Sequence, residues 1–455
     1  MRLRVLPVLL CLRWRQHRRY ALIQKKMPLV LFSGRALCAA LTLTCLSPPL
    51  RAYSVLTHEA VIDALWDVQL KPVLLARFPN ATREQLKMAH GYAYGGAIIQ
   101  DLGYYPHGSK RFSDFTHYVR TGDFIRALIA ESHDLNDYAF ALGALSHYVA
   151  DLDGHRFATN VAEPVLYPKL ARKYGKFITY EQDPAAHLMT EFGFDVLEIA
   201  EGNFAPQAYH DFIGFYVAKD VLQRAFHDTY GLDLQDLFGD DFDRAIGSYR
   251  HDVSKTIPAA TRVAWAQKKG EIQKGQPGIT KRRFVYTMKR SSYERNWGKD
   301  YDRPTIADRT LAFLLKLIPP IGPLRALRFK MPTPPVEQLF MASFNRSTGQ
   351  YHGKLREAAK NELDIPDKNY DVGTFTPAGA YRLQDETCAY WLDELAKRNF
   401  SGLTPDIRTA LLAYYSNLDA PIETKRHRKR WARVLSELQA LKTAGPPRAI
   451  EAGQQ

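Results

Sequence analysis

The sequence predicts an all-α protein, with a multi-helix domain followed by a second, mostly helical region. Apolar residues recur at intervals of three and four in several separate stretches, which is the period of a helix with one buried face. Convincing runs of the alternating pattern typical of a half-buried strand are absent from the sequence. The 455 residues are 46% hydrophobic and 12% aromatic, so we expect a folded protein with a sizeable core and two or three domains.

The first 52 residues have the pattern of a targeting segment. They contain ten Lys or Arg residues and no Asp or Glu. A basic stretch precedes an apolar run from 36 to 46, which is the order of a secretory signal, and Ala52 is an acceptable residue before the cut. Met27 is an alternative start. An uncleaved membrane anchor is the other interpretation, but the apolar run is shorter than the roughly 20 residues that a spanning helix needs. We therefore expect a secreted or periplasmic protein.

Removal of this segment changes both the charge and the cysteine content. The formal net charge of +14 falls to +4, because 52 basic and 48 acidic residues remain. This mild charge gives no reason to expect a specific nucleic-acid partner. Three of the four cysteines lie in the segment, so the mature chain keeps only Cys388. Thiolate ligation of zinc is thereby excluded, and any metal site must use His, Asp and Glu.

The helices expected after the segment follow in order. Thr57 can cap a helix with apolar positions at 60, 61, 64, 65 and 68. The Gly- and Tyr-rich residues 91–106 are typical of a helix end and an irregular loop. Residues 263–303 carry clustered Lys and Arg between Gly and Pro, which is typical of a linker or a solvated basic surface. Further helices are expected near 138–152, 186–201, 211–226, 381–398, 405–416 and 423–443.

The stretch 141–155 places His147, Asp151 and His155 four residues apart. Residues at i and i+4 lie on one face of a helix, so these side chains can point into one space. A buried helix needs partners for two imidazoles and a carboxylate, and Zn²⁺ takes such ligands. For His147 and Asp151 alone, a structural pair is the simpler interpretation. His155 and the clusters elsewhere favour a metal. We expect Asp153, on the same helix, to face solvent.

Candidate ligands are grouped elsewhere in the same part of the chain. His187 and Glu191 repeat the i, i+4 spacing on another expected helix. Upstream, Asp101 lies in the glycine-rich loop and His117 lies in Phe-Thr-His. His58 is the sixth residue of a chain that begins at Tyr53. Asp195 lies on the Glu191 face and is an alternative ligand, whereas the nearby His90, His107, His133 and Asp114 are expected to be loop or supporting residues.

These motifs resemble the zinc-dependent phospholipase C family, which shares its fold with the S1/P1 nucleases. The pieces that carry the resemblance are residues 57–62, 96–104, 115–117, 146–155 and 187–191. The interval of four between Asp151 and His155 is similar to the branch that contains the N-terminal domain of glycosylphosphatidylinositol-specific phospholipase D. The resemblance implies an all-helical catalytic domain over 53–262. Residues 263–455 are left as a basic linker and a helical region of unknown role.

The resemblance also implies a ligand set for two to three zinc ions. Asp101, His117, His147 and Asp151 hold one ion. Asp151 also bridges to a second ion, which is bound by His58 and by the α-amine and carbonyl of Tyr53. His155, His187 and Glu191 hold the last. Asp101 is a ligand, the catalytic base, or both.

The function expected from this set is the hydrolysis of a phosphodiester by metal-activated water. A phospholipase C acting at a membrane surface, as a monomer, is the leading hypothesis. An S1/P1-type nuclease is the alternative within the same chemistry. A non-catalytic metalloprotein whose function lies in the C-terminal region is the alternative from a different class.

Overall fold

The computed structural model describes residues 55–201, 216–275, 277–278, 280 and 327–444. The predicted targeting segment 1–52 and Tyr53 lie outside these residues, as do 281–326. The all-α prediction is confirmed, because the described residues form helices and helical turns, and one isolated bridge between Asn369 and Thr374 is the only β-type pairing among them. None of the helices in these ranges is long and apolar enough to cross a membrane.

The chain up to residue 201 forms α3 (Val55–Leu65), the π turn η1 (Trp66–Leu70), α4 (Lys71–Arg77), α5 (Arg83–Gly96), the 3₁₀ turn η2 (Ile99–Tyr104), α6 (Lys110–Tyr118), α7 (Thr121–Ala130), α8 (Leu135–Gly154), the π turn η3 (His155–Thr159), α9 (Asn160–Leu166), α10 (Pro168–Tyr174) and α11 (Pro184–Glu201). Thr57 lies within α3 and does not cap it. The helices expected near 138–152 and 186–201 are confirmed.

The later helices are α13 (Lys219–Tyr230), α14 (Leu234–Phe238), η4 (Gly239–Asp241), α15 (Phe242–His251), η5 (Asp252–Thr256), α16 (Ile257–Gly275), α20 (Pro334–Ala359), α21 (Arg382–Lys397), α22 (Pro405–Tyr414), η7 (Glu423–Arg426) and α23 (Arg428–Thr443). Helix α16 continues across residue 263, where a linker is expected, and buries Val263, Trp265 and Ile272. The division into two regions at this point stays a prediction.

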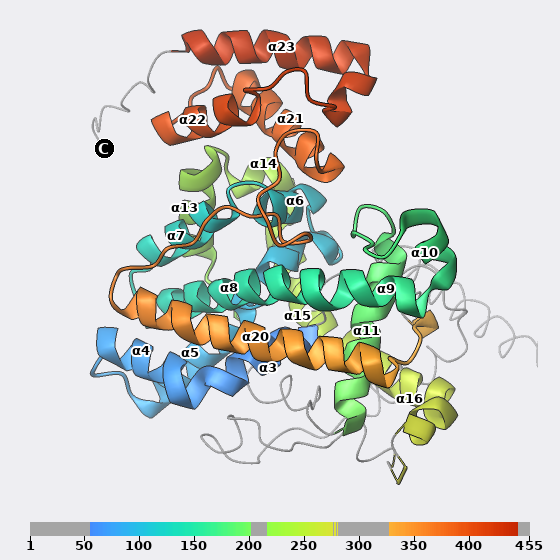
Figure 1. Cartoon of the computed structure of the whole chain (residues 1–455). Helices are drawn as coiled ribbons and strands as arrows, with labels where there is room; N and C mark the ends of the chain where they lie inside the picture. Colours follow the sequence, from blue (N-terminus) through green and yellow to red (C-terminus); the bar gives the residue numbers. More distant parts are fainter. Residues whose placement is uncertain (1–54, 202–215, 276, 279, 281–326, 445–455) are drawn as a thin grey trace, which may run out of the picture. The chain divides into compact units, whose positions relative to one another are not determined.

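Helix α8 is the central element, and it is buried on every side from Tyr138 to Gly154. Its start is capped by the carboxylate of Asp134, which accepts hydrogen bonds from the backbone N–H groups of Asn136 and Asp137. Helices α3, α5, α7 and α20 pack against it, and Figure 1 shows α20 running alongside α8. Polar side chains on such a helix can face only other parts of the protein, so they need internal partners.

The expectation that Asp153 faces solvent is wrong. The residue is only 5% exposed, and Gln350 of α20 donates a hydrogen bond of 3.3 Å to its Oδ1. Burial raises the pKa of Asp153 to about 6. The cause is α20, which covers a face of α8 that the local sequence pattern leaves polar.

Helices α5 and α8 cross closely because each has a glycine at the contact. A Cβ atom at Gly143 would lie 2.2 Å from the carbonyl oxygen of Ala93, and one at Gly96 would lie 2.0 Å from that of Phe140. Any larger side chain at either position would force the helices apart. The close crossing brings the end of α5 and the turn η2, which carries Asp101, against the middle of α8.

Candidate metal centre

The C-terminal half of α8 and the first residue of η3 bring three of the predicted ligands to one space, as their spacing predicts. His147 and Asp151 are 0% exposed and His155, the first residue of η3, is 5% exposed. Nε2 of His147 lies 3.1 Å from Oδ2 of Asp151, and Nε2 of His155 lies 3.8 Å from Oδ1. A π turn at this point suits a site, since such turns are frequent at functional positions.

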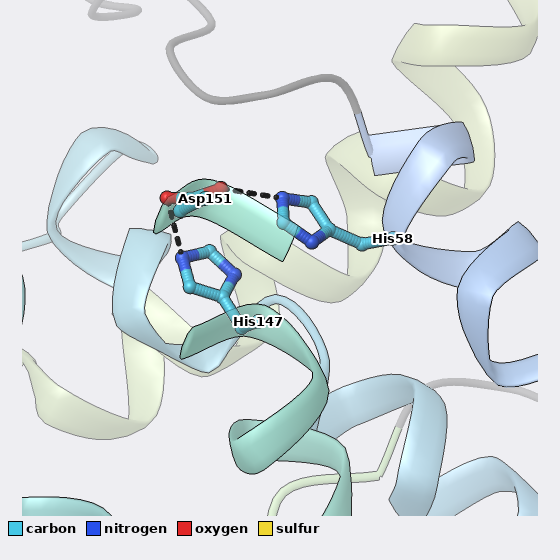
Figure 2. A group of neighbouring side chains, drawn as sticks. All are labelled: His58, His147 and Asp151. Atoms are coloured by element: carbon cyan, nitrogen blue, oxygen red, sulfur yellow. Dashed lines mark ion pairs between the residues drawn. The ribbon is translucent and has the colours of Figure 1, made fainter. Parts of the chain in front are cut away.

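Helix α3 brings His58 to the other side of the same carboxylate. Figure 2 shows the Asp151 carboxylate paired with both His58 and His147. Nε2 of His58 lies 3.3 Å from Oδ1 of Asp151. The rings of His58 and His147 are stacked, with centroids 4.3 Å apart. Asp195 holds the start of α3, because it accepts hydrogen bonds from the Thr57 hydroxyl at 2.9 Å and the Leu56 N–H at 3.3 Å. Asp195 thus has a supporting role for His58.

Asp101 and His117 complete what we call the inner cluster: Asp151 with His58, Asp101, His117 and His147. Nε2 of His117 lies 3.3 Å from Oδ1 of Asp101 and 3.5 Å from Oδ2 of Asp151. Turn η2 carries Asp101 and α6 carries His117. Ring nitrogens and carboxylate oxygens from four elements therefore converge on Asp151.

Helix α11 forms what we call the outer cluster: His155, His187 and Glu191. Oε1 of Glu191 lies 3.0 Å from Nε2 of His187 and 3.2 Å from Nε2 of His155. The i, i+4 pair on α11 thus faces the last ligand of the α8 segment. Asp151 is the link between the two clusters, because its Oδ1 faces both His58 and His155.

Three of the imidazoles are oriented by a contact at their other nitrogen. Nδ1 of His147 lies 2.9 Å from the carbonyl of Ala97, and Nδ1 of His117 lies 2.8 Å from that of Ser113. Nδ1 of His187 lies 3.0 Å from the Glu163 carboxylate. Since a carbonyl or an ionised carboxylate can only accept, each Nδ1 carries the proton and each Nε2 of a neutral ring presents a lone pair. This arrangement is usual around metal-binding histidines.

The contacts between the clustered groups fit ligands of zinc better than a hydrogen-bond network. Lone pairs on Nε2 and on carboxylate oxygens repel each other unless a proton or a metal cation lies between them. Within the described chain, neither oxygen of Asp101 or Asp151 accepts a hydrogen bond. Two ligands of a tetrahedral zinc ion, each bound at about 2.0–2.1 Å, lie about 3.3–3.4 Å apart. The shortest nitrogen–oxygen distances in the two clusters, between 3.0 and 3.3 Å, approach this separation.

The local electrostatics also favour bound cations. Burial lowers the pKa of His117, but the Asp101 and Asp151 carboxylates outweigh it and raise this pKa to about 10. Burial raises and the neighbouring histidines lower the pKa of Asp151, and the net pKa lies well below its usual range. In the metal-free protein, protons on the histidines therefore balance the negative charge of the carboxylates. Bound zinc can replace these protons.

A small cavity reaches both clusters. Its lining contains Asp101, His117, Asp151, His155, His187 and Glu191, together with Tyr104, Tyr118, Tyr180, Leu188 and Asp371. Asp371 comes from the C-terminal region and was not predicted from the sequence. One of its carboxylate oxygens lies within 4.8 Å of ring nitrogens of both His155 and His187. A turn signal, Asn369-Tyr-Asp-Val-Gly373, is the sequence feature that could have drawn attention to it.

The other histidines near the motifs lie outside the groups of potential ligands found among the described residues. His90 is buried, stacks on Trp66 and lies 3.5 Å from Asp63. His107 faces Asp241. Asp114 faces Lys110 and Arg111, and His133 is exposed. Tyr53 lies outside the described part of the chain, so its role as a ligand stays a prediction.

Comparison with known families agrees with the resemblance in the motifs. Residues 57–238 match the family model described as zinc dependent phospholipase C. The match includes every predicted ligand from His58 to Glu191 and ends before Asp371. Comparison with curated proteins and with solved structures gives no match. The closer similarity to the glycosylphosphatidylinositol-specific phospholipase D branch stays a prediction. The helical region that carries both clusters is therefore similar to the zinc-dependent phospholipase C family.

Proposed function

We propose that this protein is a secreted, zinc-dependent phosphodiester hydrolase that acts as a phospholipase C on phospholipids. The observation that carries the proposal is the convergence of two buried ligand clusters on one cavity, within the region that matches the family model. The buried ligands lack thiolates, so the site is built entirely from imidazoles and carboxylates. Such ligands suit zinc, and two or three closely spaced ions suit a phosphodiester.

Bound zinc supplies Lewis acidity toward the phosphate and lowers the pKa of a water molecule that attacks it. The residues of the chain hold and orient the reacting groups. His58, His117 and His147 present Nε2 around Asp151. His155, His187 and Glu191 of the outer cluster provide a second set of ligands. Asp101 lines the cavity and has two oxygens without hydrogen bonds from described residues. It can act as a ligand and can accept the proton of the attacking water.

The lining of the cavity favours a phospholipid over a nucleic acid. Three tyrosines and Leu188 accompany the acidic and imidazole groups, and the lining formed by the described residues contains no Lys or Arg. A nuclease that binds single strands needs a basic groove that follows the backbone as well as aromatic stacking surfaces. The phosphodiester of a phospholipid carries one negative charge. The apolar part of the lipid can pack against tyrosine rings.

The proposal includes secretion, with cleavage after Ala52, and action as a monomer at a membrane surface. Cleavage at that point gives Tyr53 a free α-amine, which with its own carbonyl can form a five-membered chelate. Sequencing the N-terminus of protein recovered from the culture medium tests the secretion and the cleavage site. Recovery of the protein only inside the cells, with residues 1–52 attached, would contradict them.

The test of the activity is incubation of purified protein with phosphatidylcholine, phosphatidylinositol and single-stranded DNA, with and without a chelator. We expect release of diacylglycerol and a phosphorylated head group from at least one lipid, and loss of this release on chelation. Release of phosphatidic acid would indicate cleavage on the other side of the phosphate. Hydrolysis of DNA without lipid hydrolysis would favour the nuclease. Zinc binding without hydrolysis of any of the three would favour a non-catalytic metalloprotein.

A further inference from the structure

The loop of the C-terminal region that carries Asp371 is built to lie against the end of α8. Oδ1 of Asn369 accepts a hydrogen bond of 3.0 Å from the Asp371 N–H, and the N–H of Gly373 donates to the Asn369 carbonyl at 2.9 Å. Gly373 has φ +71°, and a Cβ there would lie 2.7 Å from the carbonyl oxygen of Leu152. The turn therefore requires glycine both for its conformation and for its closeness to α8.

The same loop is fixed to the inner cluster. The N–H of Tyr370 donates to the carbonyl of His117 at 3.0 Å, and the Tyr370 ring lies 5.1 Å from the His117 ring and 6.0 Å from the His147 ring. Tyr370 is 0% exposed and Asp371 is 1% exposed. The loop is thus part of the wall around the ligands, although it is far from them in sequence.

The Asp371 carboxylate is held by neutral donors. Its Oδ2 accepts hydrogen bonds of 2.8 Å from the Tyr180 N–H and from the Tyr381 hydroxyl. Its Oδ1 accepts one of 3.0 Å from the side-chain amide of Asn160, which also donates to the Asp371 carbonyl at 2.7 Å. None of the ion pairs within the described ranges includes Asp371. A buried carboxylate with only neutral donors still lacks a compensating positive charge.

The imidazoles of the outer cluster are where that charge can be supplied. An Asp371 oxygen lies within 4.8 Å of ring nitrogens of His155 and His187, and the three residues line the same cavity. Oδ1 accepts a single hydrogen bond from Asn160, so it keeps lone-pair capacity toward the cavity. A carboxylate ligand of a metal is usually supported by hydrogen bonds of this kind.

We propose that Asp371 is a further ligand of the zinc ion held by His155, His187 and Glu191, supplied by a loop outside the region that matches the family model. The C-terminal region then completes the metal centre. This inference rests on the proposed zinc site, but not on the identity of the substrate. It predicts that the outer ion depends on a residue that none of the motifs contains.

The test compares Asp371→Asn with Asp385→Asn in the full chain. Asp385 is a matched control, because it lies in the same region, is 1% exposed and also accepts hydrogen bonds from neutral donors, namely the N–H groups of Gly379 and Glu423 and the Tyr414 hydroxyl. It belongs to none of the ligand groups found in the described residues. Zinc content by elemental analysis, zinc affinity by competition with a chromophoric chelator, and thermal melting are measured for each variant.

We expect Asp371→Asn to weaken the affinity for one zinc ion by at least about 100-fold, the upper end of what loss of a supporting residue costs. Asp385→Asn should keep zinc affinity while lowering the melting temperature. Tyr381→Phe removes one donor to Asp371 and should weaken the same ion by less, which keeps the test decisive if Asp371→Asn does not fold. Unchanged zinc affinity in Asp371→Asn, or in Tyr381→Phe where Asp371→Asn does not fold, would overturn the inference. Equal zinc loss in Asp385→Asn would overturn it too. If Asp371→Asn loses zinc, Asp385→Asn does not, and the wild-type protein has no phospholipase activity, only the proposed function is contradicted.

Discussion

The inner cluster takes its ligands from α3, η2, α6 and α8, and two of them, His58 and His147, do not line the cavity at all. The outer cluster, in contrast, lines the cavity with all three of its residues and faces a loop of the C-terminal region. The inner cluster therefore depends on the packing of the helical core, whereas the outer cluster depends on the cavity wall and the C-terminal loop. We expect the inner ions to be bound together with folding of the helical core, and the outer ion to exchange more readily.

The largest effect is expected at Asp151, because it is the residue shared by both clusters. Asp151→Asn removes the charge that faces four imidazoles. We expect turnover to fall by roughly 10²- to 10³-fold, because several kcal/mol of transition-state stabilisation by the bound metal are lost. Asp153→Asn, on the same helix and also buried, is the control and should leave zinc content unchanged. Turnover, zinc content and melting are measured together, and wild-type turnover in Asp151→Asn with full zinc content would show that the linking role is wrong.

A comparison of His147→Ala with His187→Ala sharpens the distinction between the clusters. His147 belongs to two of the ligand groups and His187 to one. We therefore expect His147→Ala to lose about two zinc ions and His187→Ala about one, with the larger drop in melting temperature for His147→Ala. Elemental analysis after extensive dialysis gives the numbers. Equal losses in the two variants would mean that the clusters do not bind independently.

A smaller effect is expected for Glu163→Gln, which changes only the group that orients His187. Glu163 Oε1 lies 3.0 Å from Nδ1 of His187. The amide keeps an acceptor oxygen but removes the charge, so we expect the outer ion to bind about 10- to 100-fold more weakly. Chelator competition measures this change. The inner ions should be unaffected, and their loss would indicate a defect of the whole fold.

The dependence of stability on pH is the most subtle prediction, and it concerns the inner cluster. The pKa of His117 is raised from its usual 6.5 to about 10 in the metal-free protein. A raised pKa stabilises the folded state fully below about 6.5, and the stabilisation is lost as the pH rises toward 10. Zinc replaces the proton, so the increase in melting temperature on adding zinc should grow between pH 6.5 and 9. An increase that is constant or declines over this range would contradict the assignment of His117.

Much of the fold and part of each cluster was predictable because it is encoded locally. The i, i+4 spacing of His147, Asp151 and His155 gives their shared face directly, and His187 and Glu191 repeat it on α11. The motif resemblance added His58, Asp101 and His117. The contact of α20 with Asp153 and the approach of Asp371 depend on long-range packing. No helical period or short motif encodes such contacts, so these features became visible only in three dimensions.

Anomalous diffraction from crystals of the zinc-loaded protein, with data collected on both sides of the zinc absorption edge, would locate the bound ions directly. We expect separate peaks, at least one among the nitrogens and oxygens around Asp151 and one beside Nε2 of His155 and His187. The outer peak should also lie within coordination distance of Asp371. Absence of zinc peaks from both clusters, in crystals of protein purified without chelators and supplied with zinc, would show that neither cluster is a zinc site.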